Sequence, residues 1–359
     1  MKILYVGDFS RPYSADFSRA YGFLKNKAEV TKFNYRIQLK SNFKEKKFPQ
    51  NQILKSPEEK NLLEVIKSLI KEYYSQFTDQ ISQRQRIKFF SKLNDFRRFY
   101  TLSNLKINRQ LVREVKSQEF DLVFLAKADT INYKNISKLS KRTKTWYFFM
   151  DPLSTAFKVK AHKYAVNSTF SSATFSSINN LFKKKGTKSF FITEGFDADI
   201  YHPSKINVEK KYDVIFVGTA TAKRKLFIEF LRENGVKIVC FGKGWGTHSV
   251  YLDQLAEKYR EAKIILNFTR GKVGFSDRLL LAMGTGSMVL TEYCTDAEKL
   301  FKKGKHLDWF KNRNELIDLI NFYLKNADLR EDIAESGAKF VHKNYTWKNI
   351  TRKILEKVS

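Results

Sequence analysis

Cysteine, proline and long apolar runs are all scarce in this 359-residue sequence. It contains two cysteines, Cys240 and Cys294, and five prolines. Two cysteines cannot form a disulfide framework, and both lie in apolar contexts typical of packed, reduced thiols. No window approaches the roughly 20 apolar residues of a membrane-spanning helix, and the opening MKILYVGDF resembles a short strand more than a signal peptide. These absences predict a cytoplasmic protein.

Acidic residues are also few in comparison with basic ones. The chain has 67 Lys and Arg against 37 Asp and Glu, which gives a net charge of +30 at pH 7. Such an excess predicts an anionic partner: nucleic acid, acidic lipid headgroups or a phosphorylated substrate. A genome rich in Lys, Asn, Ile and Phe codons would account for part of the excess, so charge alone does not choose among these partners.

Apolar runs that end at polar or glycine-containing turns alternate with amphipathic helical patterns along the chain. The length fits two domains of roughly 150 to 200 residues. Because the alternation occurs on both sides of about residue 200, it predicts an α/β fold of two doubly wound domains. The predicted divisions are a first domain at 1–200 with a helical insertion at about 38–115, a second domain at 201–345, and a C-terminal helix at 346–359 that could pack back on the first domain.

The stretch GFSDRLLLAMGTGSMVLTEY, residues 274–293, predicts a helix, a turn and a buried strand. Ser276 is a favourable N-cap, and Gly274 allows a ligand to approach the backbone closely. Arg278 lies beside the unpaired N–H groups of the helix start, which is a favourable place for an anion. The strand then brings Glu292 to the same rim. Taken alone, an ordinary unit of a parallel sheet explains the stretch as well.

Together with its surroundings, this stretch resembles the C-terminal half of GT-B glycosyltransferases. The supporting runs are YDVIFVGTATAKRK, AKIILNF with its Leu266-Asn267, and the helical sequence from Trp309 onward. The likeness is to the group-one branch that includes the spore-maturation-type proteins, whose motifs are similar to WYFFMDPLS and ITEGFDADIYHP here. It covers roughly residues 120–355 and implies two Rossmann-like domains facing across a cleft.

The resemblance implies that the second domain binds a nucleotide-sugar donor as co-substrate, with no cofactor and no metal. A departing diphosphate develops negative charge, which helix N–H groups and cations can stabilise. The positions that match the family's donor site or its rim are Gly218, Thr219, Lys223, Arg224, Phe241, Gly242, Asn267, Gly274, Phe275, Ser276, Arg278 and Glu292.

Two carboxylates of the family pattern are missing. The family's helix usually carries a Glu that binds the nucleotide ribose, and its position holds Leu281 here. The paired Glu of the wider retaining group falls at Val273. Glu292 is a candidate substitute, although a surface glutamate explains it equally well. The missing pair keeps open a catalytically inactive GT-B binding protein.

Three aspartates of the first domain are candidate catalytic bases: Asp8, Asp129 and Asp151 each follow a strand directly. An acceptor hydroxyl must lose a proton as it attacks, and a nearby carboxylate can accept it. Asp151 is favoured because Asp151-Pro152 matches the family motif. The Asp-x-Asp pattern at 197–199 lies in the interdomain crossing, and the five histidines lack ligand spacing, so no metal site is predicted.

The segment RQRIKFFSKLNDFRRFYTLSNLKINRQ, residues 84–110, interleaves eight Lys or Arg with five aromatic residues. This pattern is typical of a helix on an anionic membrane, of rings stacking on nucleic-acid bases, or of aromatics packed in their own domain. The favoured function is a metal-independent, hexosyltransferase-like enzyme at the inner face of the membrane, acting on a cell-envelope glycan or lipid-linked acceptor. The alternatives are a glycosyltransferase acting on modified bases of phage-type DNA and the inactive binding protein.

Overall fold

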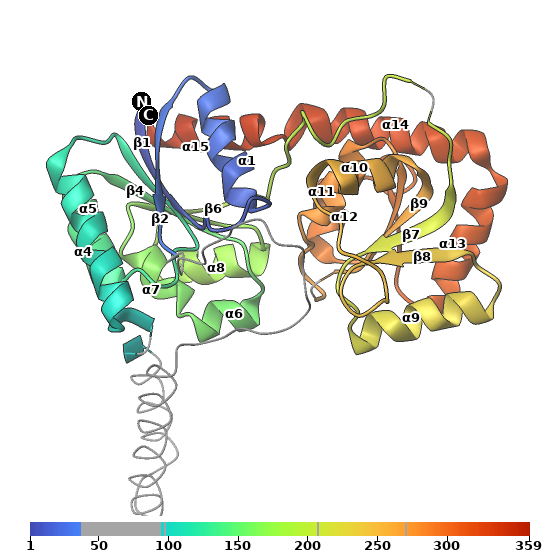
Figure 1. The fold of residues 1–359 in the computed structure, drawn as a ribbon, viewed down its shortest axis with the longest axis horizontal. Coiled ribbons are helices and arrows are strands. Elements are labelled where there is room, and N and C mark those ends of the chain that lie inside the picture. The colour runs from blue at the N-terminus through green and yellow to red at the C-terminus, as the bar shows by residue number, and fades with distance from the viewer. Residues whose placement is uncertain (37–94, 97, 207, 270) are drawn as a thin grey trace, which may run out of the picture. The chain divides into compact units, whose positions relative to one another are not determined.

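The computed structural model describes residues 1–36, 95–96, 98–206, 208–269 and 271–359 (Figure 1). Residues 1–36 and 108–359 form one compact unit. The predicted helical insertion at about 38–115 lies largely outside the described residues, and so do residues 84–94 and 97 of the basic aromatic segment. In the described part of that segment Phe99 is buried, whereas Phe96 and Tyr100 are exposed. Among the helices that are described, none is long and apolar enough to span a bilayer.

Six parallel strands form the first sheet, in the order β2-β1-β3-β4-β5-β6. Helices cover both faces of such a sheet, so its strands are continuous apolar runs, and every residue of β3 is buried. The order changes direction between β1 and β3, and polar side chains follow both strands. The strands are β1 (Lys2–Gly7), β2 (Glu29–Asn34), β3 (Leu122–Ala126), β4 (Lys144–Phe149), β5 (Phe170–Ala173) and β6 (Ser189–Phe191).

The helices around this sheet lie on its two faces, and with it they make up the first lobe. Figure 1 shows α1 beside the C-terminal helix α15 on one face, with α7 and α8 on the other. Ser14 caps α1 by accepting a 3.3 Å hydrogen bond from Asp16 N. The helices are α1 (Ala15–Lys25), α4 (Leu102–Ser117), α5 (Tyr133–Ser140), α6 (Leu153–Lys158), α7 (Ala161–Val166), α8 (Ser176–Lys184) and α15 (Trp347–Val358).

Five parallel strands form the sheet of the second lobe, in the order β11-β10-β9-β7-β8. They are β7 (Tyr212–Val217), β8 (Ile238–Phe241), β9 (Ala262–Asn267), β10 (Met288–Glu292) and β11 (Asp308–Phe310). The connecting helices are α9 (Ala222–Glu233), α10 (Leu252–Arg260), α11 (Arg278–Gly284), α12 (Thr295–Leu300), α13 (Arg313–Lys325) and α14 (Ala327–Asn344). The order changes direction between β7 and β9, where sheets of this kind bind ligands.

Two chain crossings connect the lobes, and they are hydrogen-bonded to each other. Phe196 N donates to Tyr345 O at 3.1 Å, and Trp347 N donates to Phe196 O at 2.9 Å. Trp347 then fits between two glycines: a Cβ added to Gly22 would lie 2.7 Å from Trp347 O, and one added to Gly195 would lie 2.9 Å from its indole Cδ2. Only glycine leaves room for this helix start.

The last helix, α15, packs along α1 and so belongs to the first lobe, although its sequence follows the second. Asn26 Nδ2 donates to Lys348 O at 2.7 Å and to Thr351 Oγ1 at 2.8 Å. At the other end of the helix, Lys144 Nζ donates to Val358 O. The apolar face of α15 is buried, with Ile350 and Ile354 each 1% exposed. The end of the chain therefore completes the core of the first lobe.

Candidate active site

A cavity of about 530 Å³ lies at the carboxyl end of the second sheet. Its walls come from the loops after β7 and β8, from the start of α11, from the residues that lead into α1, and from the crossing after β6. The carboxyl ends of parallel strands are where α/β folds place ligand contacts. The predicted donor-site residues that line this cavity are Gly218, Thr219, Phe241, Gly242 and Arg278.

The loops after β7 and β8 approach each other through glycine. Gly218 and Gly242 have φ of +154° and +121°, conformations that side chains rarely adopt. A Cβ on Gly242 would lie 2.9 Å from Gly218 O, so glycine is required for the contact. Trp245 Nε1 also donates to Gly218 O at 2.8 Å. These contacts hold Gly218 and Gly242, which have no side chains, at the cavity wall.

Two arginines meet beside Gly218 at the end of β7; Arg278 lines the cavity, and Arg224 is not among its lining residues. A Cβ built on Gly218 would lie 3.2 Å from Arg278 Nη1 and 3.5 Å from Arg224 Nη1. Arg224 Nη1 donates to Thr219 O at 2.8 Å, and its guanidinium lies 5.2 Å from the centre of the Phe216 ring. Paired guanidinium groups favour ligands with several anionic oxygens. The arrangement therefore suits a diphosphate.

Three other predicted donor-site residues form a polar cluster that does not line the cavity. Lys223 forms an ion pair with Glu292. The Glu292 carboxylate also accepts hydrogen bonds from Thr269 N at 3.2 Å and Thr269 Oγ1 at 3.1 Å. Asn267 Nδ2 donates to Thr291 Oγ1 at 2.9 Å. The Glu292 carboxylate thus has protein partners of its own.

The loop before α11 packs into the protein interior. Gly274 faces the ring of Phe175 so closely that a Cβ there would overlap it. Phe275 is buried, with its ring 5.9 Å from that of Phe301. The buried Ser276 hydroxyl has no hydrogen-bond partner in the part of the chain that the structure describes.

The predicted N-cap of α11 needs correction. Asp277, and not Ser276, caps the helix, accepting a 3.0 Å hydrogen bond from Arg278 N. The physical reason is that the Ser276 side chain is buried away from the free N–H groups of the first turn. Leu281, at the position of the family's ribose-binding Glu, lines the cavity one turn after Asp277.

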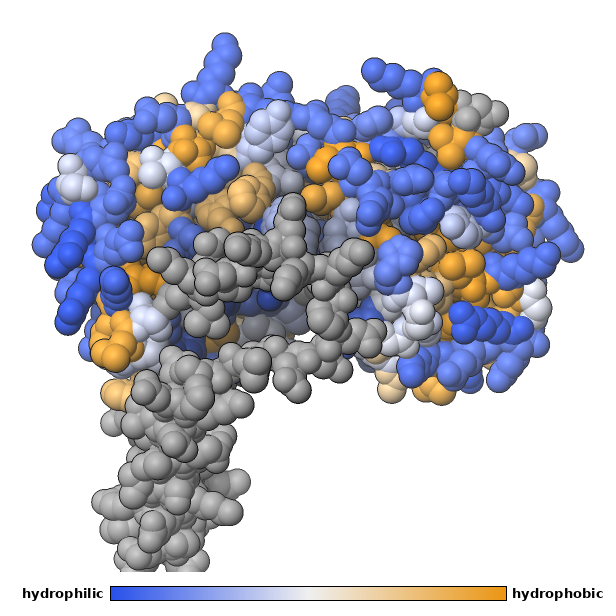
Figure 2. Space-filling view, in the orientation of Figure 1, coloured by the Kyte–Doolittle hydropathy of each residue, from blue (hydrophilic) through white to orange (hydrophobic). Residues whose placement is uncertain are grey.

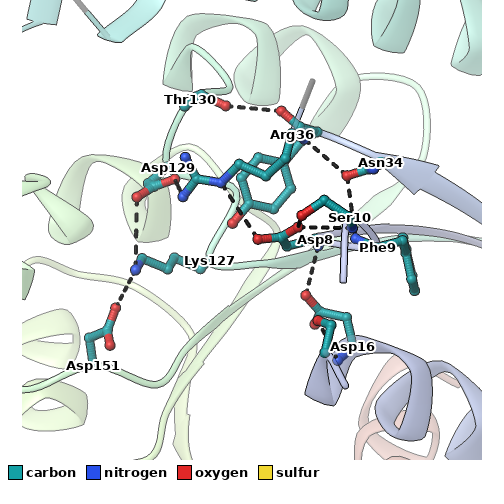
Figure 3. A network of polar contacts seen from close by, with 12 residues as sticks. Asp8, Phe9, Ser10, Asp16, Asn34, Arg36, Lys127, Asp129, Thr130 and Asp151 are labelled. Atoms are coloured by element: carbon teal, nitrogen blue, oxygen red, sulfur yellow. Dashed lines mark hydrogen bonds and ion pairs between the residues drawn. The ribbon is translucent and has the colours of Figure 1, made fainter. Parts of the chain in front are cut away.

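The three predicted catalytic aspartates lie in one ion-pair network at the ends of β1, β3 and β4 (Figure 3). Arg36 Nη2 is 2.8 Å from Asp129 Oδ1, and Arg36 Nε is 3.9 Å from Asp8 Oδ2. Lys127 Nζ is 2.6 Å from Asp151 Oδ2 and 3.9 Å from Asp129 Oδ2. Carboxylates and cations therefore alternate. The structure brings these aspartates together, but they are not among the residues that line the 530 Å³ cavity.

A strained turn positions the lysine of this network. Lys127 and Ala128 follow β3 with φ of +59° and +44°, and neither is glycine. A non-glycine residue in this region costs about 1–3 kcal/mol, which surrounding contacts must offset. Here the two ion pairs of Lys127 and a hydrogen bond from Lys127 N to Phe148 O, at 2.9 Å, hold the turn.

The cavity residues absent from the predicted site include Tyr13, Glu194, Tyr251 and Asp277. Tyr13 and Tyr251 come from different lobes, and their rings stack with centroids 4.4 Å apart and planes 15° apart. Nothing local in the sequence indicates that pair. Glu194 lies three positions after the end of β6, so its place near a strand end was a signal that the sequence could have offered.

Glu194 is held by a buried arginine of α1. Arg19 Nη2 donates to Glu194 Oε1 at 3.0 Å, and Arg19 Nε donates to Oε2 at 3.2 Å. Arg19 Nη1 also donates to Asp16 Oδ1 at 2.7 Å, and Tyr5 OH donates to that same oxygen at 2.7 Å. Burial raises the pKa of Glu194 to about 7; Arg19 opposes this rise and the charge of Asp277 adds to it.

Residues 223–356 match a family described as Glycosyl transferase-like. The match spans 134 of the 359 residues, most of them in the second lobe. The matched residues include most of α9, Arg224 and all of α11, and they extend into α15. No curated protein matches the chain significantly.

Solved structures resemble the whole chain at low identity. HepE from Anabaena, in complex with UDP-glucose, is 14% identical, with a TM-score of 0.63 and coverage of 100% of this chain and 99% of that one. A TarM mutant from S. aureus, in complex with fondaparinux, α-GlcNAc-glycerol and UDP, is 10% identical, with a TM-score of 0.62 and coverage of 100% and 99%. A sucrose-phosphate synthase from Thermosynechococcus elongatus is 9% identical, with a TM-score of 0.61 and coverage of 99% and 98%.

These likenesses show the fold. The predicted α/β class with two doubly wound, Rossmann-like lobes of the GT-B type is confirmed. The likeness to the spore-maturation branch stays a prediction. Within the described ranges, no group of three or more His, Cys, Asp or Glu is arranged to hold a metal ion.

Proposed function

We propose that the protein is a metal-independent GT-B glycosyltransferase that moves a hexose from a nucleotide-sugar donor to an acceptor in the cavity. The observation that carries this proposal is the pair of arginines, Arg224 and Arg278, beside Gly218 at the cavity wall. A volume of about 530 Å³ falls in the range of small-molecule sites. The complex of HepE with UDP-glucose supports a donor of the same chemical class.

In this proposal the diphosphate lies against the two arginines, beside Gly218 and Thr219 at the end of β7. Phe241 and Gly242 border the nucleobase. Six further residues shape the surrounding loops, and we assign them no direct contact with the donor: Lys223, Asn267, Gly274, Phe275, Ser276 and Glu292.

Asp277 is our candidate for the ribose hydroxyls. Leu281 cannot accept a hydrogen bond, and Glu292 already has Lys223 and Thr269 as partners. Asp277 lies one helical turn before Leu281 and lines the cavity. A carboxylate can accept hydrogen bonds from two neighbouring hydroxyls.

We place the acceptor on the first lobe, residues 1–200 with the helix at 346–359, and the donor on residues 201–345. The acceptor would be a cell-envelope glycan or a lipid-linked sugar at the inner face of the membrane. Asp151, Asp8 and Asp129 remain candidate bases on that side, and their ion pairs already offset much of their charge.

The surface of α1 supports a peripheral membrane location. Phe17 and Tyr21 are exposed on this helix, with Lys32 Nζ 5.2 Å from the first ring centre and Lys25 Nζ 4.7 Å from the second. Figure 2 shows apolar side chains gathered over α1 among hydrophilic ones. Aromatic rings beside lysines are the composition of helices that lie on anionic membranes.

The apolar wall at Leu281 favours one alternative, a binding protein without turnover. A thermal-shift screen of nucleoside diphosphates and their sugars tests the shared donor site. A ligand at 100 times its dissociation constant stabilises the protein by about 2.7 kcal/mol. Absence of any shift would refute the donor site.

A turnover measurement distinguishes an enzyme from a binding protein. We expect turnover of the nucleotide-sugar to continue in the presence of EDTA. Restoration of lost activity by Mn²⁺ or Mg²⁺ would refute metal independence. Retention of DNA in preference to anionic liposomes would instead favour a nucleic-acid acceptor.

A further inference from the structure

Glu194 brings a buried carboxylate to the wall of the proposed donor cavity. It follows β6 at the start of the first crossing and is 8% exposed. The cavity is also lined by Ser14 and Ser18 on the same lobe, and by Asp277 and Arg278 on the other. A ligand that fills the cavity would therefore contact groups of both lobes near this carboxylate.

Arg19 fixes the carboxylate in one orientation. It donates to both oxygens of Glu194, and its guanidinium lies 5.2 Å from the centre of the Trp347 ring and 5.9 Å from that of Phe148. A carboxylate has about four lone-pair sites. Oε1 accepts one hydrogen bond from Arg19, so it keeps a site for a hydroxyl in the cavity.

The charges around Glu194 do not balance. Arg19 is shared between two carboxylates, those of Glu194 and Asp16, and it contacts both directly. Asp277 adds a further negative charge from the second lobe, and Tyr5 contributes a neutral hydroxyl to Asp16. Burial disfavours the charged carboxylate most, and Arg19, shared between two acids, opposes this only in part, so the pKa of Glu194 is raised although Arg278 also lines the cavity.

We propose that Glu194 is the catalytic base that accepts the proton of the acceptor hydroxyl. This inference rests on the proposed function. The acceptor oxygen forms a bond to the anomeric carbon while the bond from that carbon to the diphosphate oxygen breaks. The bonding electron pair leaves with the nucleoside diphosphate, the hydroxyl proton moves to Oε1 of Glu194, and water later removes it.

Glu194 replaces the three aspartates that the sequence suggested as catalytic bases because they follow strands. Asp8, Asp129 and Asp151 lie in a network with Arg36 and Lys127, and they do not line the cavity. Glu194 lines the cavity and has a pKa of about 7, close to the value at which a base is both available and effective near neutral pH.

The test uses UDP and UDP-glucose as probes, with water as the acceptor and UDP release as the signal. Glu194→Gln removes the base while keeping a group that Arg19 can bind. It should keep UDP affinity within about twofold and lower turnover about 100-fold or more, as loss of a general base does. In the wild-type protein, turnover should fall below a midpoint near pH 7, because protonated Glu194 cannot accept a proton. This decrease in turnover at low pH, the acid limb of the pH profile, should be absent in the variant.

Two further variants separate catalysis from structure. Glu194→Asp keeps an ionisable group, so it should keep an acid limb at a reduced rate, and it serves if the Gln variant fails to fold. Glu261→Gln is the matched control: Glu261 is also buried and paired, with Lys211 and Lys258, but lies outside the cavity. It should leave turnover and the acid limb unchanged.

Wild-type turnover and an unchanged acid limb in Glu194→Gln would overturn the proposal while leaving the donor site intact. UDP binding without turnover in the wild-type protein would overturn it too, and would favour the binding protein. Failure of the wild-type protein to bind any nucleoside diphosphate would overturn the proposed function, and this inference with it.

Discussion

Replacing Arg224 and Arg278 by alanine, singly and together, tests the donor site most directly. Both guanidinium groups lie within 3.5 Å of the Cβ position of Gly218, so a diphosphate there would accept hydrogen bonds from both. A hydrogen bond to a charged group contributes about 1.5–3 kcal/mol. At about 1.4 kcal/mol per factor of ten, each variant should weaken UDP binding about 12- to 140-fold.

The two effects should not add. The arginines would share one ligand group, and residues that share a partner show coupling energies of about 0.5–3 kcal/mol. Isothermal titration calorimetry with UDP at 0.15 M salt measures all four proteins of the cycle. Arg313→Ala is the control, because its guanidinium lies 4.9 Å from the centre of the Phe230 ring and, unlike those of Arg224 and Arg278, is not among the groups nearest to the Gly218 Cβ position.

Three results would refute the reasoning. Unchanged UDP affinity in both single variants would remove the arginines from the site. An equal loss in Arg313→Ala would show that only the net charge matters. Loss of folding in either variant would show a structural role, although Arg224 is only half-buried and its contact with Phe216 is worth about 0.5–1 kcal/mol.

Gly242→Ala should destabilise the fold and lower UDP affinity, since its Cβ would lie 2.9 Å from Gly218 O. Gly235→Ala is the control, because Gly235 also has a positive φ but no atom lies within 4 Å of its Cβ position. It should lower the free energy of unfolding by only about 1–2 kcal/mol and leave UDP binding intact. Equal effects in denaturant titrations would contradict the close contact. Changing Arg84, Arg86, Arg97 and Arg98 to Gln should reduce binding to anionic liposomes, at about 1 kcal/mol per cation. Liposome binding that does not change would exclude the segment as an anchor.

Much of the fold could be predicted because strand signals in this chain are local. β3 and β7 are apolar runs that stop at a polar or glycine residue, and such a pattern needs no knowledge of distant contacts. The structure places Gly218 and Arg278 at the cavity. Arg278 could be placed from its residue type beside a helix start, whereas Gly218 was assigned through the family resemblance.

The features that sequence missed depend on partners far along the chain. Glu194 differs from other strand-end acids through Arg19, 175 positions away. Ser276 has the composition of an N-cap, but tertiary packing buries its side chain, so Asp277 takes the role. Glu292 similarly pairs with Lys223, 69 positions away. Pairings of this kind leave no period or spacing in the sequence from which they could be predicted.

The return of α15 to the first lobe sets the order in which the chain can mature on the ribosome. Trp347, which fits between Gly22 and Gly195, is synthesised 152 positions after Gly195 (347 minus 195). At about 5–20 residues per second this interval lasts roughly 8–30 s. During that time the second lobe is translated while the side of α1 that receives α15 stays uncovered. Chains released early would leave that groove open to proteases, so only complete translation closes the first lobe.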